Sequence, residues 1–157
     1  MDFVLYEEES RQIAAICDRL LREANAKVVF LVDKNGQLLA SSGASKDLDT
    51  TSLASLTAGN VAAMGGLAKL IGEKEFPTQF HEGERESLHM SIVAGRVVLV
   101  VIFDARSSLG LVRLRVKRAG EELARVFDAL ARKQPAPGAQ SPFAEITDED
   151  IDQLFSE

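Results

Sequence analysis

Two histidines and three glutamates between them are the residues of this chain that could bind a metal ion. His81 and His89 are the only histidines of the sequence, and Glu82, Glu84 and Glu86 separate them. A metal site would need one or more of these glutamates beside the histidines, and their spacing is not diagnostic of such a site. We therefore expect both histidines on the surface of strands, and we expect neither a metal ion nor another cofactor.

No other group of residues in the sequence is typical of an active site. The chain has no phosphate-binding loop, no glycine-rich turn between a strand and a helix, and no cysteine and histidine cluster. Its single cysteine, Cys17, falls on the apolar stripe of a predicted helix, so we expect an inert core thiol rather than a nucleophile. We therefore predict a protein without catalytic residues of its own.

The sequence also indicates a cellular compartment. A single cysteine cannot form a disulfide within the chain, which fits a reducing compartment. The longest apolar run, 97–103, is too short to span a bilayer, and the N-terminus lacks the basic start of a signal peptide. We therefore expect a cytoplasmic protein.

The net charge of −6 is unevenly distributed along the chain. Six of the 24 acidic residues lie in the segment 143–157, which has no basic residue, and the remaining 18 acidic residues balance 18 basic ones. Binding to nucleic-acid phosphates needs clustered cations on an accessible surface. The charge distribution therefore argues against nucleic acid as the main partner.

Four basic residues lie near the start of the last predicted helix, namely Arg113, Arg115, Lys117 and Arg118. They could bind an acidic partner, or the acidic C-terminal segment of this chain. The alternative, which we favour, is a solvated helix face whose cations pair in part with Glu121 and Glu122.

Hydrophobic periodicity predicts three helices and five strands. The predicted helices cover 7–25, 49 or 50 to 71, and 109–133, and the predicted strands cover 27–33, 37–42, 79–82, 86–93 and 96–103. Asp49 or Thr50 could cap the central helix, and Asn35-Gly36 is typical of a two-residue hairpin turn. The segment 109–116 also fits an alternating strand, although we favour a helix there.

The predicted order, α-β-β-α-β-β-β-α, indicates one α/β domain of the α+β sandwich type over 1–133. We expect a five-stranded, mostly antiparallel sheet with the central helix on one face and the first and last helices on the other. The segment 134–142, rich in proline, glycine and alanine, is a predicted linker. The segment 143–157 predicts an amphipathic helix too short to be stable alone, so it would form on docking.

The predicted central helix has three interior glycines, each costing about 1 kcal/mol of helix stability relative to alanine. One face should pack in the core and carries Leu53, Leu56, Met64, Leu67 and Ile71. The other face is small and nearly uncharged, with Ser55, Ala58, Gly59, Ala62, Gly65, Gly66 and Lys69. This small face indicates either an interface or tight packing within the chain. Asn60 falls on the leucine side, so it either satisfies a core backbone group or shows that the helix is rotated.

These motifs resemble the Roadblock (dynein light chain) family, and within it a group of bacterial members. The resemblance rests on the element order and on four segments that together span most of the chain: 26–37, 49–73, 80–83 and 141–146. It implies a homodimer whose central helices lie side by side and whose edge strands extend the sheet across the two-fold axis. It also implies that two protomers bind one Ras-like small GTPase and activate it, as part of cell polarity and motility control, at a cell pole.

The resemblance implies a role for three sets of residues. The GTPase would sit on the paired central helices, over Ser55, Ala58, Ala62, Gly65, Gly66 and Lys69. The dimer interface would include Gly59, Ala63, Phe80 and His81. The C-terminal segment would dock on the GTPase through Phe143, Ile146, Ile151, Leu154 and Phe155.

Two questions stay open from the sequence. Arg106, in a predicted loop, is the arginine best placed by context to enter a GTPase active site, but the resemblance implies activation by repositioning of the GTPase switch loops. A scaffold that binds the GTPase without activating it would use the same surface.

Overall fold

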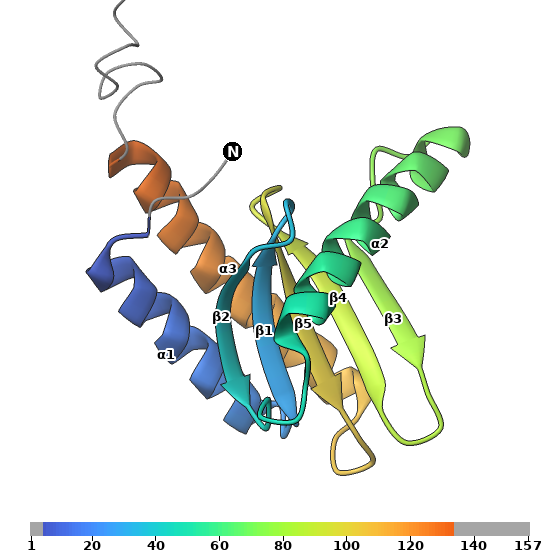
Figure 1. The fold of residues 1–157 in the computed structure, drawn as a ribbon, viewed down its shortest axis with the longest axis horizontal. Helices are drawn as coiled ribbons and strands as arrows, with labels where there is room; N and C mark the ends of the chain where they lie inside the picture. Colours follow the sequence, from blue (N-terminus) through green and yellow to red (C-terminus); the bar gives the residue numbers. More distant parts are fainter. Residues whose placement is uncertain (1–4, 134–157) are drawn as a thin grey trace, which may run out of the picture.

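The computed structural model describes residues 5–133, which form three helices and five strands in the predicted order. Figure 1 shows their arrangement. The elements are α1 (Glu7–Glu23), β1 (Val28–Asp33), β2 (Leu38–Gly43), α2 (Thr50–Leu70), β3 (Thr78–Glu82), β4 (Ser87–Val93), β5 (Val97–Phe103) and α3 (Leu109–Lys133). The strand alternative for 109–116 is therefore wrong. The predicted linker and C-terminal segment lie outside the described residues.

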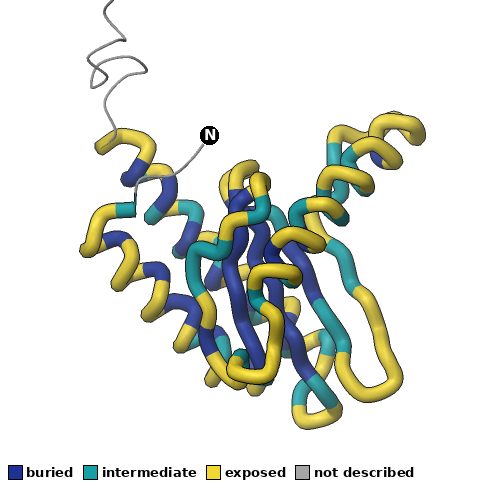
Figure 2. The backbone as a smooth tube through the Cα atoms, viewed as in Figure 1, coloured by how far each residue is buried: buried dark blue, intermediate teal, exposed yellow. Residues whose placement is uncertain are grey.

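The five strands form one sheet in the order β2-β1-β5-β4-β3, and every neighbouring pair is antiparallel. The central pair, β1 and β5, runs from Val28 opposite Ile102 to Asp33 opposite Val97. Both strands are buried along their whole length, which Figure 2 shows in dark blue. Helices α1 and α3 cover one face and α2 lies on the other, as predicted.

The turn between β1 and β2 has one residue more than predicted. The backbone N–H of Gly36 donates to the carbonyl of Asp33 at 3.1 Å, and the N–H of Asp33 donates to the carbonyl of Gln37 at 2.9 Å. Gly36 has a φ of 91°, which favours glycine, and the Asp33 carboxylate accepts from the N–H groups of Asn35 and Gln37. These bonds stabilise a three-residue loop in place of the expected two-residue turn.

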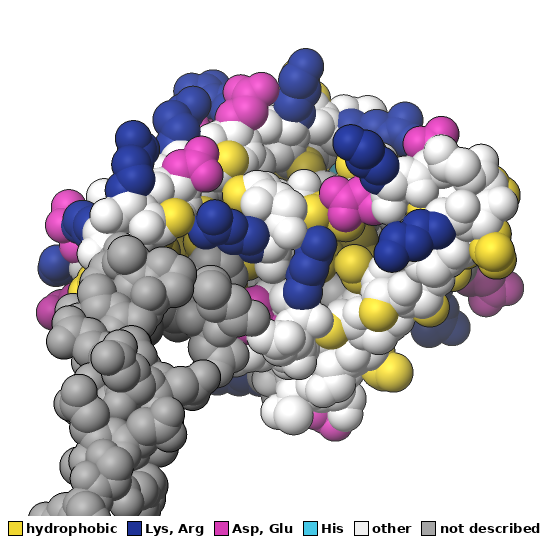
Figure 3. All heavy atoms as spheres, turned by 90° about the horizontal axis from the view of Figure 1, so that it is seen from above, with side chains coloured by type: hydrophobic (Ala, Val, Ile, Leu, Met, Phe, Trp, Pro, Cys, Tyr) yellow, Lys and Arg dark blue, Asp and Glu magenta, His cyan; other side chains and the backbone are white. Residues whose placement is uncertain are grey.

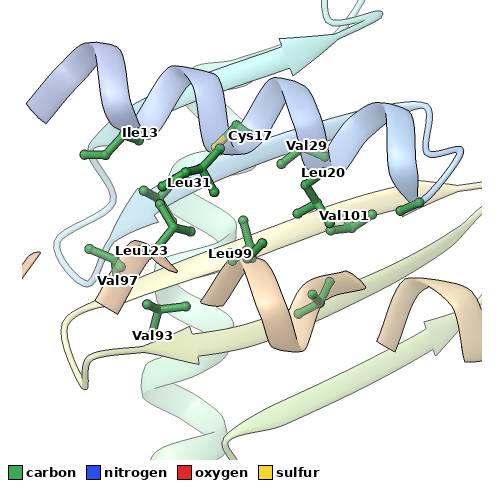
Figure 4. Close-up of a cluster of buried hydrophobic side chains, with 14 of the residues drawn as sticks. Ile13, Cys17, Leu20, Val29, Leu31, Val93, Val97, Leu99, Val101 and Leu123 are labelled. Atoms are coloured by element: carbon green, nitrogen blue, oxygen red, sulfur yellow. The ribbon is translucent and has the colours of Figure 1, made fainter. Parts of the chain in front are cut away.

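The main core lies between the sheet and the helix pair α1 and α3. Ile13, Cys17 and Leu20 of α1 point at the strands in Figure 4, where they contact side chains of β1 and β5. Cys17 is fully buried, and burial raises the pKa of its thiol to about 12. The predicted inert core cysteine is therefore confirmed.

Helix α2 packs on the opposite face through its N-terminal half. Leu53, Ala54 and Val61 contact the second core cluster, which includes Phe30 and Val100. The predicted cap is present, because the Asp49 carboxylate accepts from the N–H of Ser52 at 3.0 Å. The C-terminal half of α2 extends past the strands in Figure 1.

The predicted core face of α2 is wrong in part, because the helix is turned by about one residue step from the expected orientation. The buried residues of the helix are Ala54, Thr57 and Ala68, whereas Leu56, Leu67 and Ile71 are exposed. One residue step is about 100° of rotation. Leu53 and Met64 of the predicted face stay half-buried, and Leu53 packs on the second core cluster. Asn60 is only half-buried, and its Oδ1 has no hydrogen-bond partner among the described residues.

Part of the basic run on α3 is paired within the fold. The Nε atom of Arg118 lies 3.6 Å from Oε1 of Glu122, as the solvated-face interpretation predicts. The Nη1 atom of Arg115 lies 3.9 Å from Oε2 of Glu23 on α1. Glu122 also accepts from Arg19, so these ion pairs join α1 to α3. Over 5–133, no helix is long and apolar enough to cross a membrane.

Candidate functional site

The solvent-facing side of α2 is the most unusual surface of the described chain. Its residues recur every three or four positions and so lie along one face of the helix. We call this set the outer stripe: Leu56, Gly59, Ala63, Leu67 and Leu70. Leu56 is 72% exposed and Leu70 is 84% exposed, and Figure 2 shows the helix mostly in yellow.

The outer stripe leaves apolar surface in water that an association could bury. Full burial of an exposed leucine side chain contributes roughly 1.5–3 kcal/mol of favourable free energy. Ile71, which is 65% exposed, lies just beyond the stripe and adds to the apolar surface. Contiguous apolar patches of this kind mark interaction surfaces in soluble proteins.

The glycines of α2 have no packing role within the described chain. A Cβ atom built at Gly59, Gly65 or Gly66 would meet nothing within 4 Å. Tight packing inside this chain therefore does not explain three residues that together cost the helix about 3 kcal/mol. Their small size leaves the helix backbone open to another molecule.

A cavity of about 430 Å³ adjoins the small face of α2. Five of the six residues predicted to bind a GTPase line it, namely Ala58, Ala62, Gly65, Gly66 and Lys69. Ser55 is exposed but does not line the cavity. In Figure 3 hydrophobic side chains are exposed on the side where α2 ends, with lysine and arginine side chains beside them.

The rest of the cavity comes from residues that the sequence analysis missed. Lys34 reaches it from the β1–β2 turn, and Lys74, Glu75 and Phe76 reach it from the segment after α2. Lys34 lies 3.8 Å from Glu75, which links the two segments across the sheet end. The order hairpin, then helix could have indicated this: β2 leads away from the turn, and α2 returns along the sheet, so the turn and the C-terminus of α2 share one end of the sheet.

The structure separates the four residues predicted for a dimer interface. Gly59 and Ala63 belong to the outer stripe, and His81 is exposed on β3, with its Nε2 atom 3.3 Å from Gln79. Phe80 is half-buried on the other face of the sheet, where its ring stacks on that of Phe103. The centroids of the two rings are 6.1 Å apart. The predicted docking residues of the C-terminal segment lie outside the described residues.

His89 is not the surface residue that was predicted. Only 2% of it is exposed, because the face of β4 that carries it is turned toward α3. Burial, and to a smaller extent Arg113, lowers the pKa of His89. Over 5–133, no three His, Cys, Asp or Glu side chains are grouped so that they could hold a metal ion.

Arg106 lies at the other end of the sheet from the cavity. Its guanidinium pairs with Asp104 at 3.1 Å, and its backbone carbonyl accepts from Asn25 at 2.6 Å. Arg106 follows the C-terminal end of β5, whereas Lys34 lies beside the N-terminal end of that strand. The length of β5 separates the two positions by about 20 Å.

Comparison with known proteins agrees with this architecture. The Roadblock/LC7 domain matches residues 12–103. Myxococcus xanthus MglB is 69% identical, with a TM-score of 0.80 over 84% of this chain and 99% of that one. The gliding protein MglB of Thermus thermophilus is 37% identical, with a TM-score of 0.77 over 82% of this chain and 97% of that one.

A third structure, described as MglB with a tetrameric arrangement, is 38% identical, with a TM-score of 0.77 over 82% of this chain and 97% of that one. The bacterial members that the sequence resembles are thus the MglB proteins. The chain belongs to the Roadblock/LC7 family, as an MglB-like member of it.

Proposed function

We propose that this protein is a homodimeric GTPase-activating protein for a Ras-like small GTPase of the MglA kind. The observation that carries the proposal is the exposed α2 surface, where a Cβ added at Gly59, Gly65 or Gly66 would meet no other part of the described chain within 4 Å. Bare backbone beside a cavity of about 430 Å³ offers a partner's loops room to approach closely. Two protomers present this surface to one GTPase.

The dimer forms through the outer stripe and through β3. The leucines at both ends of the stripe pack on a second copy, and the small residues between them let the two helices approach. Strand β3 is the last strand of the sheet, so its outer edge can pair with the same edge of another protomer. The description of one MglB as having a tetrameric arrangement supports self-association.

Activation works by holding the switch loops of the GTPase in a reactive arrangement. Preferential binding of one conformation shifts the population toward it, and the catalytic residues remain those of the GTPase. The cavity beside α2 is lined by lysines but by no arginine of the described chain, and Arg106 is about 20 Å away along β5. This placement supports repositioning over insertion of an arginine.

The acidic C-terminal segment makes a second contact with the GTPase. Its apolar residues dock in a groove and its carboxylates meet basic residues at the rim. In the cell, the protein acts in polarity and motility from a cytoplasmic position concentrated at a pole. The name gliding protein, given to the Thermus thermophilus MglB, supports the link to motility.

Single-turnover GTP hydrolysis by the cognate GTPase, with and without this protein, tests the proposal. We expect stimulation of about tenfold or more, which corresponds to at least about 1.4 kcal/mol of barrier. Ala62→Arg and Gly66→Arg should abolish it by filling the cavity, and both positions are exposed. Ala14→Arg is the matched control, because Ala14 is an exposed helical alanine on α1.

Two other outcomes would contradict the proposal in different ways. Binding to the GTP-loaded form without a rate increase would identify a scaffold. Full stimulation by folded Ala62→Arg and Gly66→Arg proteins would show that the GTPase binds elsewhere.

A further inference from the structure

A second cavity, of about 600 Å³, lies between β4 and the N-terminal half of α3. It is on the face of the sheet opposite α2, so it is distinct from the surface proposed to bind a GTPase. Neither α1 nor α3 covers the β3 side of this face in Figure 1. The cavity volume is within the range of roughly 300–1,000 Å³ typical of small-molecule sites.

Two buried polar side chains line this cavity without a partner. His89 is 2% exposed and its Nδ1 atom has no hydrogen-bond partner within the described chain. Ser91, two residues further along β4 and so on the same face, has an unpartnered buried Oγ atom. Buried polar atoms are normally hydrogen-bonded, so an unpartnered pair at one cavity indicates a missing ligand.

Two cations line the same cavity from α3. Arg113 and Lys117 are one helical turn apart, and within residues 5–133 no carboxylate lies within ion-pair distance of either. Glu121, one turn further, adds a single negative charge. Burial lowers the pKa of His89, so its imidazole is neutral at pH 7 and the cavity lining has one net positive charge.

Apart from the hydroxyl of Thr78, the remaining lining is apolar and includes Val93, Val116 and Ala124. Gly120 lines the cavity as well, and a Cβ there would lie in van der Waals contact with Val93, at 3.8 Å, so the missing side chain leaves that space free. We propose that this cavity binds a small organic monocarboxylate, whose carboxylate is held by His89, Ser91, Arg113 and Lys117 and whose apolar body lies against Val93, Val116 and Ala124.

The single net positive charge of the cavity lining and its apolar side chains favour a monocarboxylate over other ligands. A phosphate has a second charge that Glu121 would oppose, and an uncharged apolar molecule would leave His89 and Ser91 unpartnered. A monocarboxylate satisfies both polar atoms by accepting their hydrogen bonds and neutralises the excess cation.

Titration of the full-length, isotope-labelled protein with hexanoate tests the proposal by NMR. We expect a saturable shift of the His89 ring resonances and no shift for His81, which is exposed on β3 and does not line the cavity. Hexanol has as many carbons as hexanoate but no charge, and inorganic phosphate is an anion without an apolar chain. Each should bind at least about tenfold more weakly than hexanoate.

Variants distinguish the cavity from general attraction to a basic surface. Arg113→Gln should weaken hexanoate binding about tenfold, and His89→Phe, followed by backbone amide shifts, should do the same. Arg118→Gln is the matched control, because Arg118 is on the same helix but does not line the cavity. Equal loss in the control, equal binding of hexanol or phosphate, or no binding of hexanoate would each overturn the proposal.

Discussion

Lys34, in the turn between β1 and β2, and Gly66, in the C-terminal half of α2, line the same cavity. Glu75 lies 3.8 Å from Lys34 and lines the cavity as well. A partner that enters this cavity therefore meets a cation from the sheet end and bare helix backbone together. An arginine at position 66 would occupy that space and add a charge of the same sign as Lys34.

Gly66→Ala should raise the free energy of unfolding by about 0.5–1 kcal/mol, because alanine favours the helix and a Cβ there meets nothing within 4 Å. Urea unfolding at fixed protein concentration measures the change. Gly43→Ala is the contrasting variant and should destabilise, because its Cβ would lie 2.4 Å from the carbonyl of Lys27 and its φ is 97°. A loss of stability in Gly66→Ala would show that the folded protein needs a glycine there.

Leu56→Asp should convert the proposed dimer to a folded monomer, because it places a charge in the outer stripe. Leu56 is 72% exposed in the protomer, so the fold itself should tolerate the change. Sedimentation velocity measures the mass, and circular dichroism checks the fold. Leu114→Asp is the matched control, since Leu114 is 62% exposed on α3 and should leave the mass unchanged. An unchanged mass for Leu56→Asp would contradict the proposed interface.

The arrangement of elements could be predicted from the sequence, because it depends on periodicity. The continuous apolar runs at 28–32 and 97–103 lie in the two central strands, and the stripe beginning at Val112 lies on α3. These patterns are strong because burial on a sheet requires them over many residues.

The rotation of α2 could not be predicted by the same rule. Large apolar residues usually mark the buried face, but Leu56, Leu67 and Leu70 are exposed, and Ala54 and Thr57 are buried instead. His89 was misplaced for a related reason: alternation put it on the polar face of β4, and helices cover both faces of this sheet. Lys34 lines the cavity because the order of the elements brings the β1–β2 turn and the end of α2 to the same end of the sheet. Local sequence patterns do not show this arrangement.

Glu9→Gln should destabilise the protein at neutral pH and have no effect in acid. Its carboxylate, which is almost fully buried, accepts a hydrogen bond from Lys133, and this bond lowers the pKa of Glu9 below its ordinary value of 4.5. A lowered carboxylate pKa stabilises the fold above the unfolded pKa, and this contribution is lost as the pH falls through the folded pKa.

Urea unfolding of wild type and Glu9→Gln from pH 7 to pH 3 measures this difference. The difference should be largest at pH 7 and should shrink as the pH falls below 4.5 toward the lowered pKa of Glu9 in the folded protein. Glu8→Gln is the control: Glu8 also lies 3.8 Å from Lys133, but its side chain is 66% exposed, so the change should be smaller. A difference that persists unchanged at pH 3 would show that the ionised carboxylate is not its source.

Arg106→Ala should leave the proposed stimulation of GTP hydrolysis within about twofold, whereas loss of a transition-state arginine costs roughly 10³–10⁵ in rate. The reason is that Arg106 lies far from the surface proposed to bind the GTPase. Asp104 holds the Arg106 guanidinium through two hydrogen bonds, of 3.1 and 3.2 Å, at the end of β5 remote from Lys34 and Gly66. Single-turnover hydrolysis and GTPase binding, measured side by side, separate catalysis from docking.

The matched control for this variant is Asp104→Asn, which frees the guanidinium without removing it and should also leave stimulation unchanged. If Arg106→Ala abolished stimulation while binding stayed intact, Arg106 would have to reach the nucleotide. The GTPase would then have to contact the β5–α3 loop as well as α2, across about 20 Å of sheet. Repositioning of the switch loops from α2 alone would in that case be the wrong mechanism, even with the binding surface correctly placed.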